Sequence, residues 1–131
     1  MFKNLKSIFI IRLEYFKYYI MKRKLEKILN KIVEKLKREY KPLKIILYGS
    51  YAHGNFRDDS DIDLFILKNT DERRVDRFIE VKRIIYNPNR KIPVSPLIYS
   101  PAELNERVRL GDDFILEILN TGIILYEESA S

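Results

Sequence analysis

The spacing of apolar residues predicts a long helix at the start of the chain. Between Met21 and Tyr40 apolar residues recur every three or four positions, which places them on one face of a helix. Pro42 ends this helix because proline lacks the amide hydrogen that a helix interior requires. Residues 1–20 continue the pattern with apolar residues on several sides, so we expect the domain or a second chain to cover them. The apolar positions of the first face are Leu25, Ile28, Leu29, Ile32, Val33 and Leu36.

Short apolar runs after this helix predict strands. LKIILYG (residues 43–49) is typical of a buried strand that Gly49 ends, and DIDLFIL (residues 61–67) of a second strand. IPVSPLIY (residues 92–99) predicts a third strand, and its two prolines favour an edge position. GIILYE (residues 122–127) is expected as a strand or an extended tail.

Helical patterns separate these runs. SYAHG (residues 50–54) is long enough for one or two turns, whereas ERRVDRFIEVKRIIY (residues 72–86) predicts a longer helix. Ser100 and Glu103, with Pro101 between them, form a helix-start capping box, and DFILEILN (residues 113–120) predicts a final helix. The order indicates an α/β or α+β fold in which helices flank a small sheet.

Composition excludes several classes of protein. A chain of 131 residues fits one compact domain, and the absence of cysteine excludes disulfides and thiolate metal sites. No cleavable signal peptide is evident, so we expect a cytoplasmic protein. Arg12, Glu14 and Lys17 interrupt the apolar segment near the N-terminus, which argues against a membrane span of about 20 apolar residues.

The positive charge is concentrated in the first helix. Residues 1–41 hold 13 Lys/Arg and 4 Glu, which gives this segment a net charge of +9. The remaining residues carry −3, so the whole chain has a net charge of +6. Such a segment is typical of a solvated helix face, but it also suits nucleic acid, an acidic membrane surface or an acidic partner.

Four aspartates gather at the start of the second predicted strand. They are Asp58, Asp59, Asp61 and Asp63, and such a group is stable only where a positive charge compensates their repulsion. In a strand, residues two apart project to one face about 6.6 Å apart, so Asp61 and Asp63 converge. Carboxylates are ligands of Mg²⁺, and a pair of such ions can assist phosphoryl or nucleotidyl transfer.

The turn before these aspartates predicts an anion site. A strand that ends at Gly49 and Ser50 and turns into a short helix presents backbone amides and a hydroxyl to a phosphate. Glycine allows the backbone to approach the ligand closely. A triphosphate is therefore expected between this turn and metal ions held by Asp61 and Asp63.

The spacing Gly-Ser, ten residues, Asp-x-Asp resembles the signature of the superfamily of DNA polymerase β and kanamycin nucleotidyltransferase. KIILYGSYAHGNFRDDSDIDLFIL is most similar to the small "minimal nucleotidyltransferase" proteins of prokaryotes, and the resemblance begins near Met21. It implies a mixed sheet with flanking helices, formed by a nucleotidyltransferase domain at residues 21–131 after a helical extension at residues 1–20.

The resemblance also implies an activity and a partner. Members transfer AMP from ATP to a hydroxyl with Mg²⁺, and they commonly act as antitoxins of small all-helical HEPN-type toxins, in characterised cases by adenylylating a tyrosine. Carried over by position, Gly49 and Ser50 bind the β- and γ-phosphates, while Asp61 and Asp63 are catalytic and hold the metal ions. Arg57 is expected either to bind a phosphate or to neutralise Asp58 and Asp59.

One position departs from the family pattern. The resemblance places a third carboxylate where this chain has Ser95, and a neutral hydroxyl is a weaker metal ligand, so a second metal ion and full activity are both in question. Asp59 is a conceivable replacement for the missing third acid, but its position in the sequence does not match that of the acid in the family. His53, the single histidine, is more often an ordinary surface residue than a phosphate donor, and Tyr51 is expected to pack.

Three interpretations remain. The first is an ATP-dependent enzyme that adenylylates a HEPN-type toxin, and the second is a catalytically weakened fold that neutralises this partner by contact. The third is a transferase that acts on an RNA end, with the +9 segment as its electrostatic footprint. The helical extension is also a candidate for self-association into a homo-oligomer.

Overall fold

The computed structural model describes the backbone of residues 5–129, and the side chains of residue 10 and residues 12–129. The chain divides into two units, the first ending at Ile32 and the second beginning at Val33. The predicted boundary between residues 20 and 21 stays a prediction.

Helix α1 (Leu5–Glu39) confirms the long helix that the apolar spacing predicts, and residues 1–4 of that prediction lie outside the described part. Lysine, leucine and glutamate favour the helix, and Lys37 and Arg38 in its last turn stabilise the carboxyl end. The helix ends before Pro42, and Lys41 takes a positive φ of 54° there. Among the described helices, none is long and apolar enough to cross a membrane.

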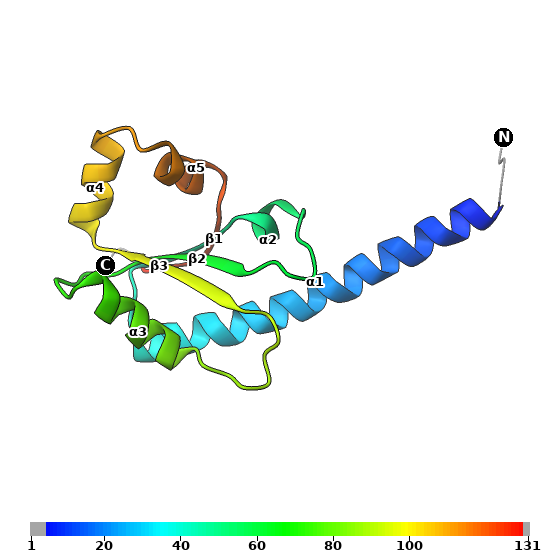
Figure 1. The fold of residues 1–131 in the computed structure, drawn as a ribbon, viewed down its shortest axis with the longest axis horizontal. Helices are drawn as coiled ribbons and strands as arrows, with labels where there is room; N and C mark the ends of the chain where they lie inside the picture. The colour runs from blue at the N-terminus through cyan, green and yellow to red at the C-terminus, as the bar shows by residue number, and fades with distance from the viewer. Residues whose placement is uncertain (1–4, 130–131) are drawn as a thin grey trace. The chain divides into compact units, whose positions relative to one another are not determined.

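The second unit is built on a mixed four-stranded sheet in the order β3-β2-β1-β4 (Figure 1). Strand β1 pairs antiparallel with β2 and with β4, and β2 pairs parallel with β3. The predicted strands are confirmed, including the edge position of the proline-containing strand. Their bounds are β1 Lys44–Tyr48, β2 Ile62–Leu67, β3 Val94–Tyr99 and β4 Ile123–Glu127.

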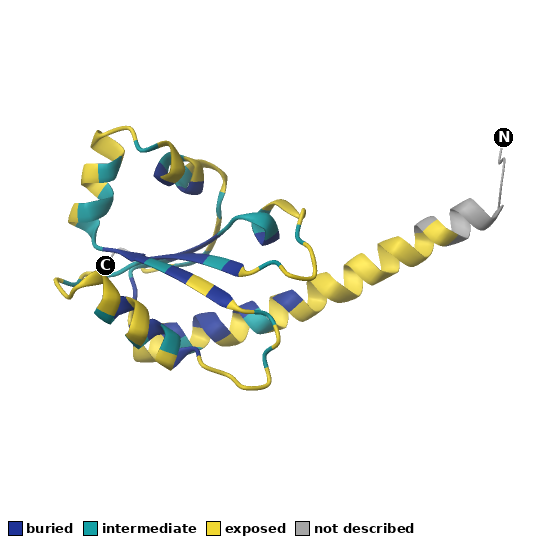
Figure 2. Cartoon of the chain, in the orientation of Figure 1, coloured by how far each residue is buried: buried dark blue, intermediate teal, exposed yellow. Residues whose placement is uncertain are grey.

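Successive side chains of each strand point to opposite sides of the sheet, so the sheet has two faces that pack against different helices. One face packs against α4 (Pro101–Arg109) and α5 (Asp113–Thr121), and α3 (Arg74–Ile84) lies on the opposite side (Figure 1). The α5 side is centred on Ile46, Phe65, Tyr99, Ile115 and Ile118. Figure 2 shows that burial in this unit is concentrated in the strands and in the helix faces turned toward them.

Local sequence signals fix the helix starts on the α5 side. The predicted capping box of α4 is present, because Ser100 and Glu103 each accept a backbone hydrogen bond from the other, and Pro101 occupies the first turn. Asp112 caps the start of helix α5, and its side chain accepts a hydrogen bond from the amide of Ile115.

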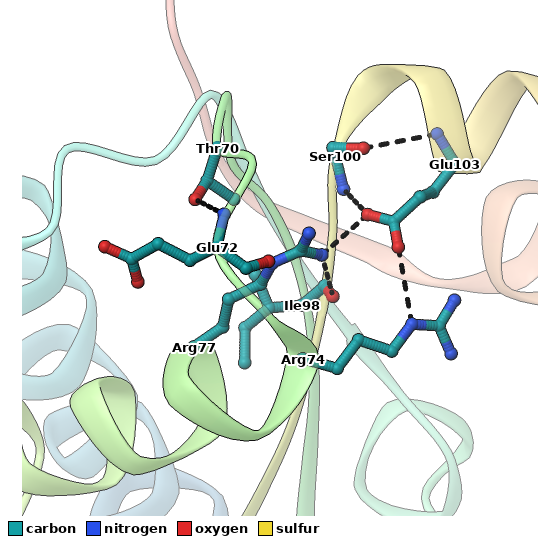
Figure 3. A network of polar contacts seen from close by, with 7 residues as sticks. All are labelled: Thr70, Glu72, Arg74, Arg77, Ile98, Ser100 and Glu103. Carbon is teal, nitrogen blue, oxygen red and sulfur yellow. Dashed lines mark hydrogen bonds and ion pairs between the residues drawn. The ribbon is translucent and has the colours of Figure 1, made fainter.

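A buried arginine connects α3 to α4 across β3, a contact that sequence analysis did not predict (Figure 3). Arg77 is only 5% exposed, and its guanidinium donates to Glu103 at 2.6 Å and to the carbonyl oxygens of Glu72 and Ile98. Glu103 also accepts hydrogen bonds from Arg74 and from the Ser100 amide. Because the buried charge is paired and hydrogen-bonded, α4 is held in one position on the sheet.

Candidate active site

The turn after β1 is shaped by a glycine in a conformation that other residues rarely adopt. Gly49 has φ 76° and ψ −155°, and helix α2 (Ser50–His53) begins at the next residue. A Cβ atom at Gly49 would lie 2.3 Å from Oδ2 of Asp63, closer than any real contact. The Gly-Ser turn and the carboxylate of Asp63 therefore lie side by side, as the sequence predicts.

Asp63 is placed by the pairing of β1 with β2, where it lies opposite Tyr48. Partial burial raises the pKa of Asp63, and the negative charge of Asp61 raises it further. Asp61 is exposed and comes two residues earlier, just before β2 begins. The structure thus brings the two carboxylates into electrostatic contact, and a cation between them would relieve their repulsion.

Ser95 lies beside Asp63 on the neighbouring strand. It is the register partner of Asp63 in the parallel pairing of β2 with β3, so both side chains project from the same face. Within the described residues, no group of three or more His, Cys, Asp or Glu is arranged to hold a metal ion. A serine therefore occupies the strand position at which the family resemblance places the third acid.

The donor set fits Mg²⁺ with two carboxylates and one weak neutral ligand. Hard oxygen ligands suit Mg²⁺, which keeps several water molecules and usually takes only one or two carboxylates from a protein. Asp61 and Asp63 supply these two, and the carboxylate of Asp63 lies against Gly49 in the space that a side chain at that position would take. The residues present fit one ion, and a second ion lacks an acid at Ser95.

The remaining predicted residues lie in α2 and in the loop before β2. Arg57 is exposed, and its amide donates to the hydroxyl of Ser60 at 2.7 Å, but its predicted phosphate contact stays a prediction. His53 is exposed at the end of α2. Tyr51 is buried and stacks on Phe56 with ring centroids 4.6 Å apart, which confirms that it packs.

The loop also carries Asp58 and Asp59, both of which are exposed. Burial raises the pKa of Tyr51, and the charges of Asp58 and Asp61 raise it further. Asp58 therefore lies close enough to act on the same hydroxyl as Asp61.

Tyr48 and Phe114 border the site, and sequence analysis missed both. Tyr48 lies opposite Asp63, and burial, followed by the charge of Asp63, raises the pKa of Tyr48 to about 12. Its ring meets that of Phe114 edge to face, with centroids 5.8 Å apart. The sequence predicts that successive side chains of β1 point to opposite faces of the sheet. It does not predict the contact of Tyr48 with Phe114, because that contact depends on how α5 packs on the sheet.

A mixed sheet with a Gly-Ser turn set against an Asp-x-Asp strand defines the nucleotidyltransferase class of enzymes. The family described as "Polymerase beta, Nucleotidyltransferase" matches residues 30–131, and the chain belongs to this family. The match includes β1, the turn and β2, so the predicted fold and enzyme class are confirmed.

Three relatives from Methanocaldococcus jannaschii carry the name "putative protein adenylyltransferase". One is 33% identical over 108 residues, covering 79% of this chain and 72% of the relative. A second is 29% identical over 103 residues, covering 77% of this chain and 97% of the relative. The third is 31% identical over 85 residues, covering 61% of this chain and 75% of the relative.

A solved structure shares the fold. The crystal structure of a protein titled "putative nucleotidyltransferase" from Sulfolobus solfataricus aligns with a TM-score of 0.60 at 18% identity. The alignment covers 85% of this chain and 87% of that protein. At this identity the likeness concerns the fold and not the substrate.

Proposed function

We propose that this nucleotidyltransferase uses ATP and Mg²⁺ to transfer AMP to a hydroxyl group of a protein. The observation that carries the proposal is the position of the Asp63 carboxylate directly against the Gly49 turn, where a phosphate bound by the turn would lie next to a metal ligand. The names of the three relatives, which describe protein adenylyltransferases, support a protein as the acceptor.

Each residue has a role in binding the triphosphate. The backbone amides after Gly49 and the hydroxyl of Ser50 bind the β- and γ-phosphates, and Arg57 adds a positive charge from the loop. Asp61 and Asp63 would hold Mg²⁺, and the ion would supply positive charge that offsets the charge of the phosphates. Such an ion would also offset the repulsion between these carboxylates and the phosphates of ATP.

The transfer forms one bond and breaks one bond. The acceptor oxygen attacks the α-phosphorus, the bond to the β-phosphate breaks, and pyrophosphate leaves with the electron pair. The proton of the acceptor hydroxyl passes to solvent, since Ser95 provides no carboxylate to accept it.

The acceptor that we propose is a tyrosine of a small all-helical HEPN-type toxin, so that the chain acts as an antitoxin. The proposal rests on the resemblance to minimal nucleotidyltransferases. A second candidate function is neutralisation of this partner by binding alone, and the register of Ser95 beside Asp63 favours it, because loss of an acid weakens the chemistry.

The two candidates are separated by incubating the protein with ATP labelled at the α-phosphate, Mg²⁺ and the helical product of the adjacent gene. Adenylylation places label on a partner tyrosine, located by mass spectrometry, and Asp61→Asn or Asp63→Asn abolishes it. Asp59→Asn, a matched change in the neighbouring loop, retains the label. Inhibition of the partner without label supports binding alone, whereas label on added RNA supports a transferase that acts on RNA ends.

A further inference from the structure

A half-exposed aromatic ring lies at the border of the proposed nucleotide site. Phe114 is 51% exposed at the start of α5, and one side of its ring contacts Tyr48 edge to face. Apolar rings of this size are normally buried, so the exposed part of Phe114 offers a surface for a flat ligand.

The aromatic pair is adjacent to the carboxylate that contacts the glycine turn. Tyr48 pairs directly with Asp63 across β1 and β2, and the two side chains share a face of the sheet. Tyr48 is also the residue before Gly49. A ligand whose phosphates occupy the turn therefore has the aromatic pair next to it.

The exposed ring is held in place and does not result from a loose helix end. The side chain of Asp112 caps α5, and Ile115 and Ile118, which are 0% and 3% exposed, anchor the helix in the core. Because the helix is fixed on both sides of Phe114, a ligand that stacks on the ring causes the protein to lose little conformational entropy.

The charge around Phe114 favours a neutral group. Asp112 and Asp113 directly precede Phe114 in the sequence, and the ion pair of Asp112 with Arg107 is long, at 3.7 Å. Phosphates are repelled by this acidic end, while an uncharged base with amino donors is not. The phosphates of the substrate and its base are therefore expected at different ends of the site.

We propose that Phe114, supported by Tyr48, stacks on the base of the nucleoside triphosphate and so fixes the direction in which the substrate lies. This assignment rests on the proposed function. Every nucleobase has a π-face, so Phe114 accounts for binding of the base and not for a choice between bases.

The first test compares ATP with inorganic triphosphate in the presence of Mg²⁺, by calorimetric titration. Phe114→Ala lowers the affinity for ATP roughly tenfold, which corresponds to about 1.4 kcal/mol, because base stacking is lost. The affinity for inorganic triphosphate, which has no base, changes less than about twofold. This second ligand also shows that the variant is folded and that its phosphate site is intact.

The second test uses fluorescence, since the chain contains no tryptophan. Phe114→Trp introduces a single indole that ATP quenches by stacking and that inorganic triphosphate does not. Phe78→Trp is the matched control, because Phe78 is 44% exposed on α3, on the opposite side of the sheet, and its signal stays constant with either ligand.

The outcomes distinguish this inference from the proposed function. If the unmodified protein binds ATP and Phe114→Ala binds it equally well, the stacking role is wrong and the nucleotide site stands. An equal loss of ATP and triphosphate also overturns the stacking role. Absence of ATP binding in the unmodified protein overturns both.

Discussion

Gly49 joins the two halves of the site at the scale of a single residue. Its conformation is open almost only to glycine, and the carboxylate of Asp63 occupies the space that a side chain would need. The close approach of Asp63 to Gly49 therefore links the shape of this turn to the position of the Asp63 carboxylate.

Gly49→Ala is expected to lower the affinity for ATP by at least about tenfold, because the added methyl displaces Asp63 and strains the turn. The free energy of unfolding falls by roughly 2 kcal/mol. Titration with ATP and urea unfolding measure the two effects.

Gly111→Ala is the control, since Gly111 has a similar φ of 72° but no atom within 4 Å of the added position. It is expected to cost about 1 kcal/mol of stability and to leave ATP affinity within about twofold. Equal effects on ATP binding in the two variants would show that the contact with Asp63 is not what matters.

Ser95→Asp is expected to increase the rate of AMP transfer by roughly 10²–10³, because a carboxylate beside Asp63 restores a charged metal ligand. The rate is measured as label transferred per minute at saturating ATP. Ser95→Asn changes the size of the side chain without its charge and should give no such increase. A Ser95→Asp variant no faster than Ser95→Asn would contradict the assignment of this position.

Much of the site was predictable at this scale because its residues are close in the sequence. Gly49, Ser50, Asp61 and Asp63 fall within one strand-turn-strand segment, so their spacing alone indicates a common site. The place of Ser95 followed from the family resemblance, and the register with Asp63 agrees with it. Phe114 was not predictable, because its contact with Tyr48 joins segments more than 60 residues apart.

At the scale of elements, the ion pair between Arg77 and Glu103 connects two helices on opposite sides of the sheet (Figure 3). Burial disfavours the charge of Glu103, but hydrogen bonds from the Ser100 amide and from Arg77 outweigh it and lower the pKa of Glu103 to about 2. The sequence predicts helices α3 and α4 and the capping box at the start of α4. The contact of Glu103 with Arg77 on α3 could not be predicted, because it depends on tertiary packing.

Glu103→Gln is expected to lower the free energy of unfolding by about 3 kcal/mol at pH 7, because it leaves the buried guanidinium of Arg77 without its counter-charge. Urea unfolding measures the change. Glu106→Gln is the matched control on the same helix: Glu106 also pairs with an arginine at 2.6 Å, but the pair is exposed, so its loss is expected to change the free energy of unfolding far less.

The same ion pair predicts a dependence of stability on acid. The folded pKa of Glu103 lies below its ordinary value of 4.5, so its contribution is complete above pH 4.5 and is lost as pH falls through about 2. The difference in stability between the unmodified protein and Glu103→Gln should therefore narrow across this range. A difference that stays constant from pH 5 to pH 2 would contradict the role of the carboxylate charge.

For the whole molecule, the residues of the candidate site all fall in the second unit, whereas much of the positive charge lies in α1. All the site residues fall between Tyr48 and Phe114. The order of elements and the class of fold were predictable from periodicity and turn residues. The pairing of β4 with β1 was not, because an apolar run near the end of a chain suits an edge strand and a tail equally.

Removal of residues 1–20 is expected to leave the affinity for ATP within about twofold, because every residue assigned to the candidate site lies between Tyr48 and Phe114. It takes away four Lys/Arg and one Glu. Sedimentation should in turn show loss of any self-association, which the predicted role of the extension requires. A tenfold drop in ATP affinity would place part of the extension in the nucleotide site.

Strand β4 has a consequence for the order of folding. It borders β1, from which it is separated by about 75 residues of chain, and Ile123 and Ile124 remain 46% and 52% exposed on it. Contacts so distant in sequence form slowly, so the β1-β2 pair assembles early and β4 docks late. The strand that carries the phosphate turn thus acquires its second neighbour near the end of folding, and amide exchange should be fastest along that outer border.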